Sequence, residues 1–186
     1  NETANEKNIY GLCFLKHSTN GENIGNSFTK GRTTLFDLHY KENDQGEKAI
    51  LFISKIRKQY KHKLENGERF ITEARLYYEM DDDNEMLCFN FPIMICEYQE
   101  NGYTKNLNKQ FKENPVGYYY YFYEILKRDF KGTLWNKRMY AIKHYILFSI
   151  LTNKKIELKD VKNIFNRVLI VLLYLPGKIK TNMRFK

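Results

Sequence analysis

The sequence predicts an α/β fold, with a small mixed sheet and flanking helices over residues 1–116 and a helical extension over residues 117–186. The first part favours strands because its apolar runs are short and bounded by turn residues, whereas the second has helical apolar spacing. The chain of 186 residues contains only 3 Pro and 10 Gly, so most of it should be regular structure. Charge divides at the same point, because residues 1–116 hold 16 Lys+Arg and 18 Asp+Glu whereas residues 117–186 hold 15 and 4.

The first part begins with a predicted strand at Tyr10–Leu15, an apolar run that ends in a polar loop. A short helix is expected at Thr34–Tyr40, where Thr33 or Thr34 provides the N-cap. The apolar run Ala49–Ile53 then predicts a strand that is buried on both faces.

A second helix is predicted after Gly67–Glu73, and the acidic cluster Asp81–Asp83 is expected to end it as a solvated turn. Two short strands follow at Met86–Asn90 and Ile93–Tyr98, separated by a proline that suits a sheet edge. Asn114–Pro115 is expected to close this part of the chain.

The extension reads as three helices, at about Tyr118–Phe130, Asn136–Leu151 and Glu157–Tyr174. The third ends in Val168–Leu175, eight apolar residues, far fewer than the ~18–20 that cross a bilayer. This run suits a position in the membrane interface instead, and Pro176–Gly177 is expected to stop the helix.

Composition excludes several classes of protein. With 42% hydrophobic and 28% charged residues, the chain is neither disordered nor collagen-like. Its three cysteines, Cys13, Cys88 and Cys96, lack the spacing of a disulfide framework or a zinc module, which fits a cytoplasmic location. The basic extension implies an anionic partner, either nucleic acid or a phospholipid surface.

Six segments in order resemble a known family. They are Tyr10-Gly-Leu-Cys-Phe-Leu15, Gly21-Glu-Asn-Ile-Gly25, Gly46-Glu-Lys-Ala49, Gly67-Glu-Arg-Phe-Ile-Thr-Glu73, Ile95-Cys-Glu-Tyr-Gln-Glu-Asn-Gly-Tyr-Thr104 and Asn114-Pro-Val-Gly117. Together with the basic helical tail they resemble the acceptor-side half of a bacterial family 2 glycosyltransferase of the GT-A type. The resemblance implies transfer of a sugar from a nucleotide-sugar donor to a saccharide or lipid-linked acceptor, in cell-surface glycan synthesis at the inner face of the membrane. It also implies an inverting single displacement.

The nucleotide-sugar-binding half of this family should precede Tyr10 by ~100 residues, the size of a nucleotide-binding unit, whereas nine residues precede it here. We therefore expect the donor site to lie outside these 186 residues. The resemblance implies a divalent metal, Mg²⁺ or Mn²⁺, whose ligands are not in this chain. Asp81–Asp83 has an Asp-x-Asp spacing but lies after the Gly67–Glu73 segment instead of before it, so we interpret it as a solvated cluster.

Glycosyl transfer needs a carboxylate that takes the proton of the acceptor hydroxyl. The resemblance implies that this base comes from Gly67–Glu73, so the candidates are Glu68 and Glu73. Glu68 is favoured because it occupies the junction of loop and helix where the family has its acidic motif, although Arg69 replaces the second acid of that motif. A first-turn capping carboxylate explains Glu68 equally well, and a surface position explains Glu73.

Six residues are expected to bind substrate or donor by the same resemblance: Lys48, Arg69, Glu97, Tyr98, Gly102 and Thr104. Lys48 is a candidate phosphate contact, or else an exposed turn lysine. Glu97 and Tyr98 end a strand beside the Gly102 turn, where binding residues are common, but packing at a strand edge explains them too. Thr104 suits either a sugar contact or a helix cap.

Two other functions fit parts of the sequence. The basic extension suits a non-catalytic module that binds nucleic acid or a membrane. Trp135 and the aromatic run Tyr118–Tyr123 suit stacking on a ligand, but a helix so rich in aromatic residues is more often core. Aromatic residues at core spacing make the nucleic-acid partner the weaker of the two. A carbohydrate-recognition scaffold without catalysis is the second alternative. The sequence leaves the oligomeric state open.

Overall fold

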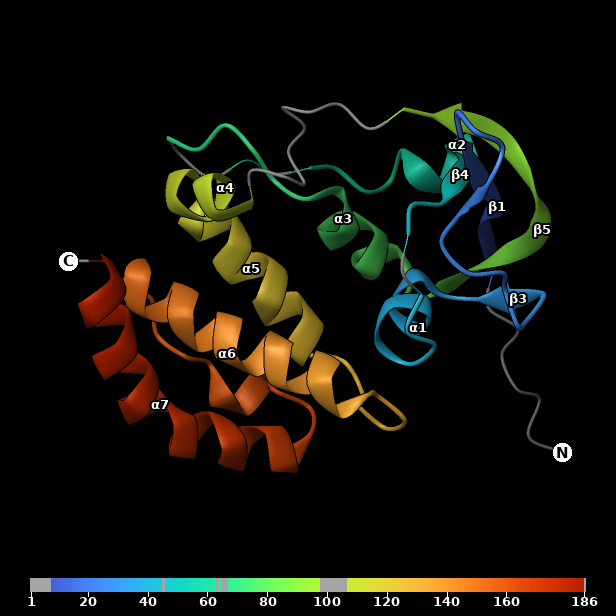
Figure 1. Ribbon diagram of the computed structural model, residues 1–186. Coiled ribbons are helices and arrows are strands. Elements are labelled where there is room, and N and C mark those ends of the chain that lie inside the picture. Colours follow the sequence, from blue (N-terminus) through green and yellow to red (C-terminus); the bar gives the residue numbers. More distant parts are fainter. Residues whose placement is uncertain (1–7, 45, 63, 65–66, 98–106, 186) are drawn as a thin grey trace, which may run out of the picture. The chain divides into compact units, whose positions relative to one another are not determined.

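The computed structural model describes residues 8–44, 46–62, 64, 67–97 and 107–185. The protein has a mixed α/β fold with an open five-stranded sheet, flanking helices and C-terminal helices (Figure 1). The chain divides into two compact units. The sheet unit comprises residues 1–61 and 76–102, and the helical unit comprises residues 62–75 and 103–186. The division passes through α3 (Glu73–Met80).

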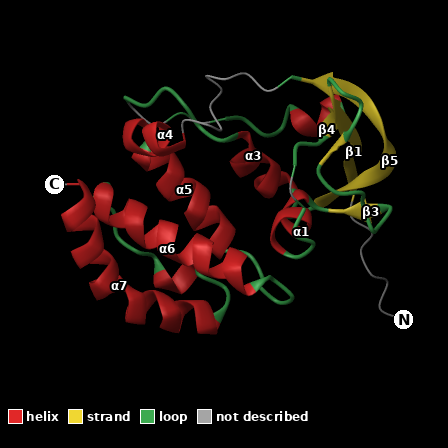
Figure 2. Ribbon diagram, viewed as in Figure 1, coloured by secondary structure: helices red, strands yellow, loops and turns green. Residues whose placement is uncertain are grey.

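The sheet is built around β1 (Asn8–Ser18), which pairs in parallel with β5 (Asn84–Cys96). The other edge of β1 pairs antiparallel with β2 (Asn23–Ile24) and with β4 (Ala49–Phe52). β3 (Arg32–Thr33) pairs antiparallel with the start of β5. The sheet is therefore mixed, as Figure 2 shows in yellow.

Two strand predictions need correction. β5 is one strand instead of two, because the register slips between Phe14 and Leu15 and a β-bulge accommodates Pro92 within the strand. β4 is not buried on both faces, since Leu51 is 54% exposed. It is paired with β1 alone, which leaves its other edge without a strand neighbour among the described residues.

The helices of the sheet unit are short. α1 (Leu35–Tyr40) begins after Thr34, whose hydroxyl accepts a hydrogen bond from the Asp37 amide as the N-cap prediction requires. α2 (Ser54–Arg57) has Ile53 at its N-cap position, with no side-chain hydrogen bond. Asp81 is buried instead of solvated, and its carboxylate accepts hydrogen bonds from the Tyr10 hydroxyl and from two amides at the start of α1.

The helical unit contains α4 (Leu107–Glu113), α5 (Pro115–Leu126), α6 (Trp135–Leu151), a short 3₁₀ turn (Leu158–Asp160) and α7 (Ile164–Phe185). α6 packs against both α5 and α7. The core of the helical unit is aromatic: the ring of Tyr118 stacks on that of Phe148, and the rings of Phe122 and Phe148 also stack. The predicted division at residue 116 falls within α5, inside this unit, and Asn114–Pro115 begins that helix.

α7 does not stop at Pro176, which corrects the prediction. The helix continues through Pro176–Gly177 to Phe185. A Cβ added to Gly177 would lie 2.9 Å from Cγ2 of Ile146, so glycine permits the close packing of α7 on α6. That packing offsets the backbone hydrogen bond that proline cannot donate.

Candidate functional site

Two motifs that are nearly fifty residues apart in the sequence meet in the helical unit. The carboxylate of Glu68 accepts hydrogen bonds from the backbone amides of Val116 (2.5 Å) and Gly117 (2.6 Å) at the start of α5. A carboxylate is stabilised at a helix N-terminus, where backbone amides point outward without partners in the helix. Gly117 permits this approach, because a Cβ there would lie 3.0 Å from Oε2 of Glu68.

Asn114 completes the connection in the opposite direction. Its Oδ1 accepts hydrogen bonds from the backbone amides of Arg69 and Phe70, each at 3.0 Å, while its Nδ2 donates to the Gln110 carbonyl. Asn114 is 2% exposed, so these are buried contacts. We call Glu68 and Asn114, with the amides that they bind, the motif clamp.

The motif clamp separates the two candidate bases. Both oxygens of Glu68 accept backbone hydrogen bonds, which gives this residue a structural role that explains its place in the sequence. Glu73 is exposed in the first turn of α3, where the dipole favours a carboxylate. Arg69 is held through its backbone by Asn114, and its side chain is exposed.

A cluster of two cations and a tyrosine lies in the same unit and was not predicted. The guanidinium carbon of Arg75 lies 5.1 Å from the centre of the Tyr120 ring, and the Lys154 ammonium lies 4.9 Å from it. The Lys154 ammonium also lies 3.2 Å from the Tyr120 hydroxyl. Arg75 follows Glu73 by two residues, but Lys154 is distant in sequence, so no local spacing could have signalled the cluster. Two cations beside one ring can attract an anionic group.

The aromatic run Tyr118–Tyr123 is mostly core, which is the favoured interpretation of its sequence. Tyr118, Tyr119 and Phe122 are at most 6% exposed, and burial raises the pKa of Tyr118 to about 12. Buried rings offer no face to a nucleic-acid base or a sugar. Trp135 differs, with 58% of its surface exposed at the start of α6.

Lys48 belongs to the sheet unit, and its side chain is buried instead of exposed. Its ammonium forms a 2.8 Å ion pair with Asp44 and donates to the Asn26 carbonyl, also at 2.8 Å. The Lys48 side chain is 2% exposed and that of Asp44 is 5% exposed. Because the ammonium already has buried partners, Lys48 is a structural residue in this structure.

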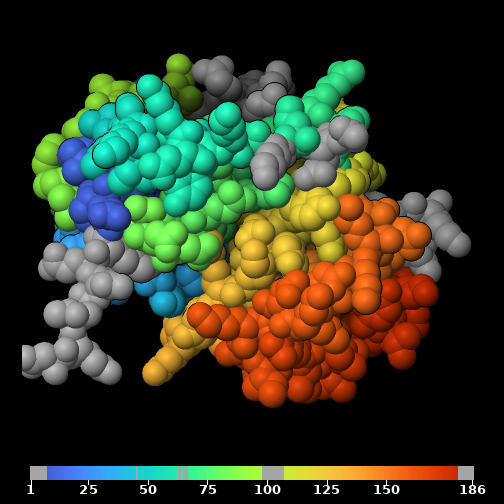
Figure 3. All heavy atoms as spheres, turned by 180° about the vertical axis from the view of Figure 1, so that it is seen from behind, coloured from blue at the N-terminus to red at the C-terminus, as the bar shows by residue number. Residues whose placement is uncertain are grey.

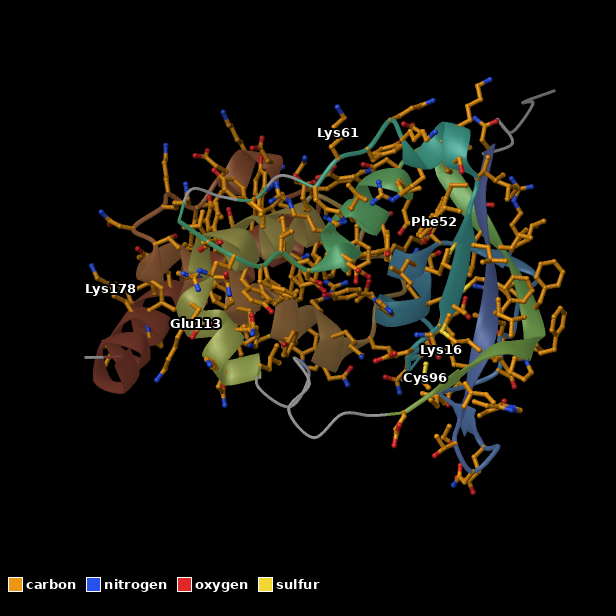
Figure 4. The ribbon with its side chains drawn as sticks, turned by 90° about the horizontal axis from the view of Figure 1, so that it is seen from above. Lys16, Phe52, Lys61, Cys96, Glu113 and Lys178 are labelled. Carbon is orange, nitrogen blue, oxygen red and sulfur yellow. The ribbon has the colours of Figure 1, made fainter. Side chains whose placement is uncertain are left out.

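The remaining predicted binding residues follow β5. Glu97 is exposed just after that strand, next to Cys96, which is labelled at the strand end in Figure 4. Tyr98, Gly102 and Thr104 lie outside the described residues, so their predicted roles stay predictions. Cys96 is partly exposed and not fully buried.

Among the described residues, the acidic cluster does not form a divalent metal site. Asp81 is the first acid of the Asp-x-Asp spacing, and its oxygens accept hydrogen bonds from Tyr10, Leu35 and Phe36. Across the described ranges, no group of three or more His, Cys, Asp or Glu side chains is arranged to hold a metal ion. The expectation of Mg²⁺ or Mn²⁺ with ligands elsewhere stays a prediction.

Within the part of the chain that the structure describes, no helix is both long enough and apolar enough to cross a membrane. Comparisons of the chain with known protein families, with curated proteins and with solved structures found no match.

Proposed function

We propose that this chain forms the acceptor-binding side of a glycosyltransferase of the family 2 type, which works with a nucleotide-sugar-binding half to build a cell-surface glycan. The motif clamp is the observation that carries the proposal. The segments Gly67–Glu73 and Asn114–Gly117 suggested the resemblance independently, and Glu68 and Asn114 bind them to each other through four backbone amides. Segments that hold one another in this way can act together in one site.

Glu73 is the proposed general base, in preference to Glu68. A base must reach the acceptor hydroxyl and take its proton as the oxygen attacks the anomeric carbon of the donor. Glu73 is exposed at the start of α3, whereas Glu68 is only partly exposed and holds the start of α5. The proton therefore passes to Glu73, and the nucleoside diphosphate leaves with the electron pair of the broken bond.

Arg69 and the cations beside Tyr120 are proposed to bind the acceptor. Arg69 has an exposed side chain on a backbone fixed by Asn114, and a fixed backbone lowers the entropy lost when a side chain binds. Arg75 and Lys154 suit an acidic sugar or a phosphate that links the acceptor to lipid. A divalent metal, when bound, would offset the charge of the leaving diphosphate.

Saccharide binding by the chain tests this proposal. The chain is applied to an array of bacterial surface oligosaccharides, and the affinity for bound sugars is then measured by NMR titration. We expect Arg69→Ala to weaken binding about tenfold, the effect of losing one charge-assisted hydrogen bond. Lys131→Ala, at another exposed basic position of the same unit, is expected to leave affinity unchanged. Absence of any bound saccharide, or equal losses in both variants, would contradict the proposal.

A further inference from the structure

The outward face of α7 is apolar instead of polar. Seven large apolar side chains on this helix are between 48% and 75% exposed: Ile164, Phe165, Val168, Val171, Leu172, Leu175 and Ile179. Their spacing of three, four and seven residues places them along one side of the helix. We call these seven residues the α7 stripe.

The opposite face of α7 is already packed, which fixes the rotation of the helix. Asn166 and Ile170 are at most 1% exposed, and Oδ1 of Asn166 accepts a hydrogen bond from Arg138 on α6. Gly177 approaches Ile146 of α6 closely. A surface helix ordinarily turns its apolar side inward. Here an apolar side is left outward because the other side makes the contacts with α6.

The size of the stripe indicates an interaction surface. From Ile164 to Ile179 it extends about 22 Å along the helix at 1.5 Å per residue. Trp135 prolongs it, because its ring centre lies 6.2 Å from that of Phe165 and its side chain is exposed. Single exposed apolar residues are common on proteins, but contiguous exposed patches mark places where proteins bind a partner or a membrane. Figure 3 shows residues of α7, in orange to red, on the outer surface of the helical unit.

Charge identifies the kind of partner. α7 contains no Asp or Glu, and Arg167 and Lys178 lie along one edge of the stripe, three helical turns apart. Lys178 is exposed and extends outward from the helix (Figure 4). Residues 117–186 hold 15 Lys+Arg and only 4 Asp+Glu. Two copies of so basic a surface repel each other, whereas an anionic surface attracts it.

We propose that the α7 stripe binds the surface of a membrane that contains anionic lipids. The helix lies parallel to the bilayer, with the stripe at the boundary of headgroups and acyl chains, Trp135 at the interface and Lys178 among the headgroups. Apolar insertion and attraction of basic residues to anionic lipid act together at such helices. The inference goes beyond the proposed function, since it depends on the α7 stripe and not on sugar transfer.

Vesicle binding by the full chain tests the inference. Trp135 is the sole tryptophan of the protein, so its fluorescence reports on this surface directly. Vesicles of phosphatidylcholine alone are compared with vesicles in which about a third of the lipid is phosphatidylglycerol, an anionic content in the range of cellular membranes. We expect flotation with the anionic vesicles, a blue shift of Trp135 emission, and weaker binding as salt screens the charges.

Two matched pairs of variants distinguish membrane binding through the α7 stripe from non-specific hydrophobic adsorption. Leu172→Gln with Leu175→Gln is expected to lower the partition coefficient at least about tenfold, because two inserted side chains are lost. Leu51→Gln with Ile53→Gln changes equally apolar, exposed positions of the sheet unit and should leave binding unchanged. Lys178→Ala should weaken binding about fivefold on anionic vesicles only, and Lys61→Ala should not.

Each other outcome overturns the inference. Equal losses in the stripe and control variants would mean that the stripe is not the membrane surface. No vesicle binding, together with a dimer that the stripe variants dissociate in light scattering, would assign the stripe to a second copy. No vesicle binding by a monomer would assign it to another protein partner. Saccharide binding is measured separately, so loss of membrane binding and failure of the proposed function remain distinguishable.

Discussion

The two units of this protein use their charged residues in different ways. The sheet unit buries a few of them: Asp81 binds Tyr10 and the start of α1, and Lys48 pairs with Asp44 inside the unit. The helical unit buries aromatic rings and keeps most of its charge outside, apart from the motif clamp. Lys48, the candidate phosphate contact, and Asp81, interpreted from the sequence as part of a solvated cluster, both have buried partners in the sheet unit. Among the described candidates, Arg69 and Glu73 are exposed in the helical unit and Glu97 is exposed in the sheet unit.

The largest effect should come from Glu73, and it should be on turnover alone. With the nucleotide-sugar-binding half present, we expect Glu73→Gln to lower sugar transfer by about 10²–10⁴, the usual contribution of a general base. Stability should stay within about 0.5 kcal/mol, because Glu73 is exposed. Release of nucleoside diphosphate measures the rate, and Glu113→Gln on α4 is the control. Unchanged turnover in Glu73→Gln would remove this residue from the mechanism.

In the sheet unit the largest effect should be on stability. Lys48→Met leaves the carboxylate of Asp44 buried without its cation, and we expect a loss of about 3–5 kcal/mol in unfolding free energy. Replacing both partners, as Lys48→Met with Asp44→Leu, should recover much of this loss. Urea denaturation followed by circular dichroism measures the loss, and hydrogen exchange of β1 amides assigns it to the sheet unit.

The control for Lys48 is a pair of the same charge type nearer the surface. Lys16 pairs with Glu47, whose side chain is 48% exposed, so Lys16→Met should cost no more than about 1 kcal/mol. If Lys48→Met cost no more than Lys16→Met, the contrast between buried charge in the sheet unit and exposed charge in the helical unit would fail.

A smaller effect is expected at the motif clamp. Glu68→Ala removes the acceptor for two amides at the start of α5 and should cost about 1–2 kcal/mol, as the loss of a helix cap does. Glu68→Gln keeps an acceptor oxygen and should cost less. Trp135 fluorescence during denaturation reports on the helical unit. A Glu68→Gln protein of normal stability that had lost transfer entirely would return the role of base to Glu68.

The features that were predicted correctly are those determined by residues close together in the sequence. The α/β class is confirmed, as is the strand through Tyr10–Leu15, because a continuous apolar run has few alternatives. The Thr34 cap is confirmed because its hydroxyl acts three residues away. α7 passes through Pro176 because its packing on α6 outweighs the local cost of proline, and packing partners cannot be read from a local pattern.

The candidate site was predictable only in part, for the same reason. Glu68 and Glu73 were singled out by their segment, but the choice between them depends on α5, whose start is nearly fifty residues further along the chain. Asp81 looked solvated because its neighbours are acids, whereas its partners come from β1 and α1. Lys154 and Arg75 both lie beside the ring of Tyr120, although each is distant from it in the sequence. A long-range contact leaves no signal in the spacing of one sequence.

The smallest expected effect is on the pH dependence of stability in the aromatic core of the helical unit. Tyr118 stacks on Phe148, and burial raises its pKa to about 12 in the folded protein, above the value of about 10 for an exposed tyrosine. Because the pKa is higher in the folded than in the unfolded protein, the buried, protonated hydroxyl contributes its full stability below about pH 10. This contribution is lost as the pH rises toward about 12.

Tyr118→Phe should therefore change stability little at neutral pH and reduce the decline between about pH 10 and 12. Denaturation followed by Trp135 fluorescence measures both. The decline should not vanish, because burial also raises the pKa of Tyr145 and Tyr140 in the same unit. If the pH dependence were identical with and without the hydroxyl, Tyr118 would titrate as an exposed residue. Its ring would then be open to solvent, and an aromatic surface for ligands over Tyr118–Tyr123 would again be possible.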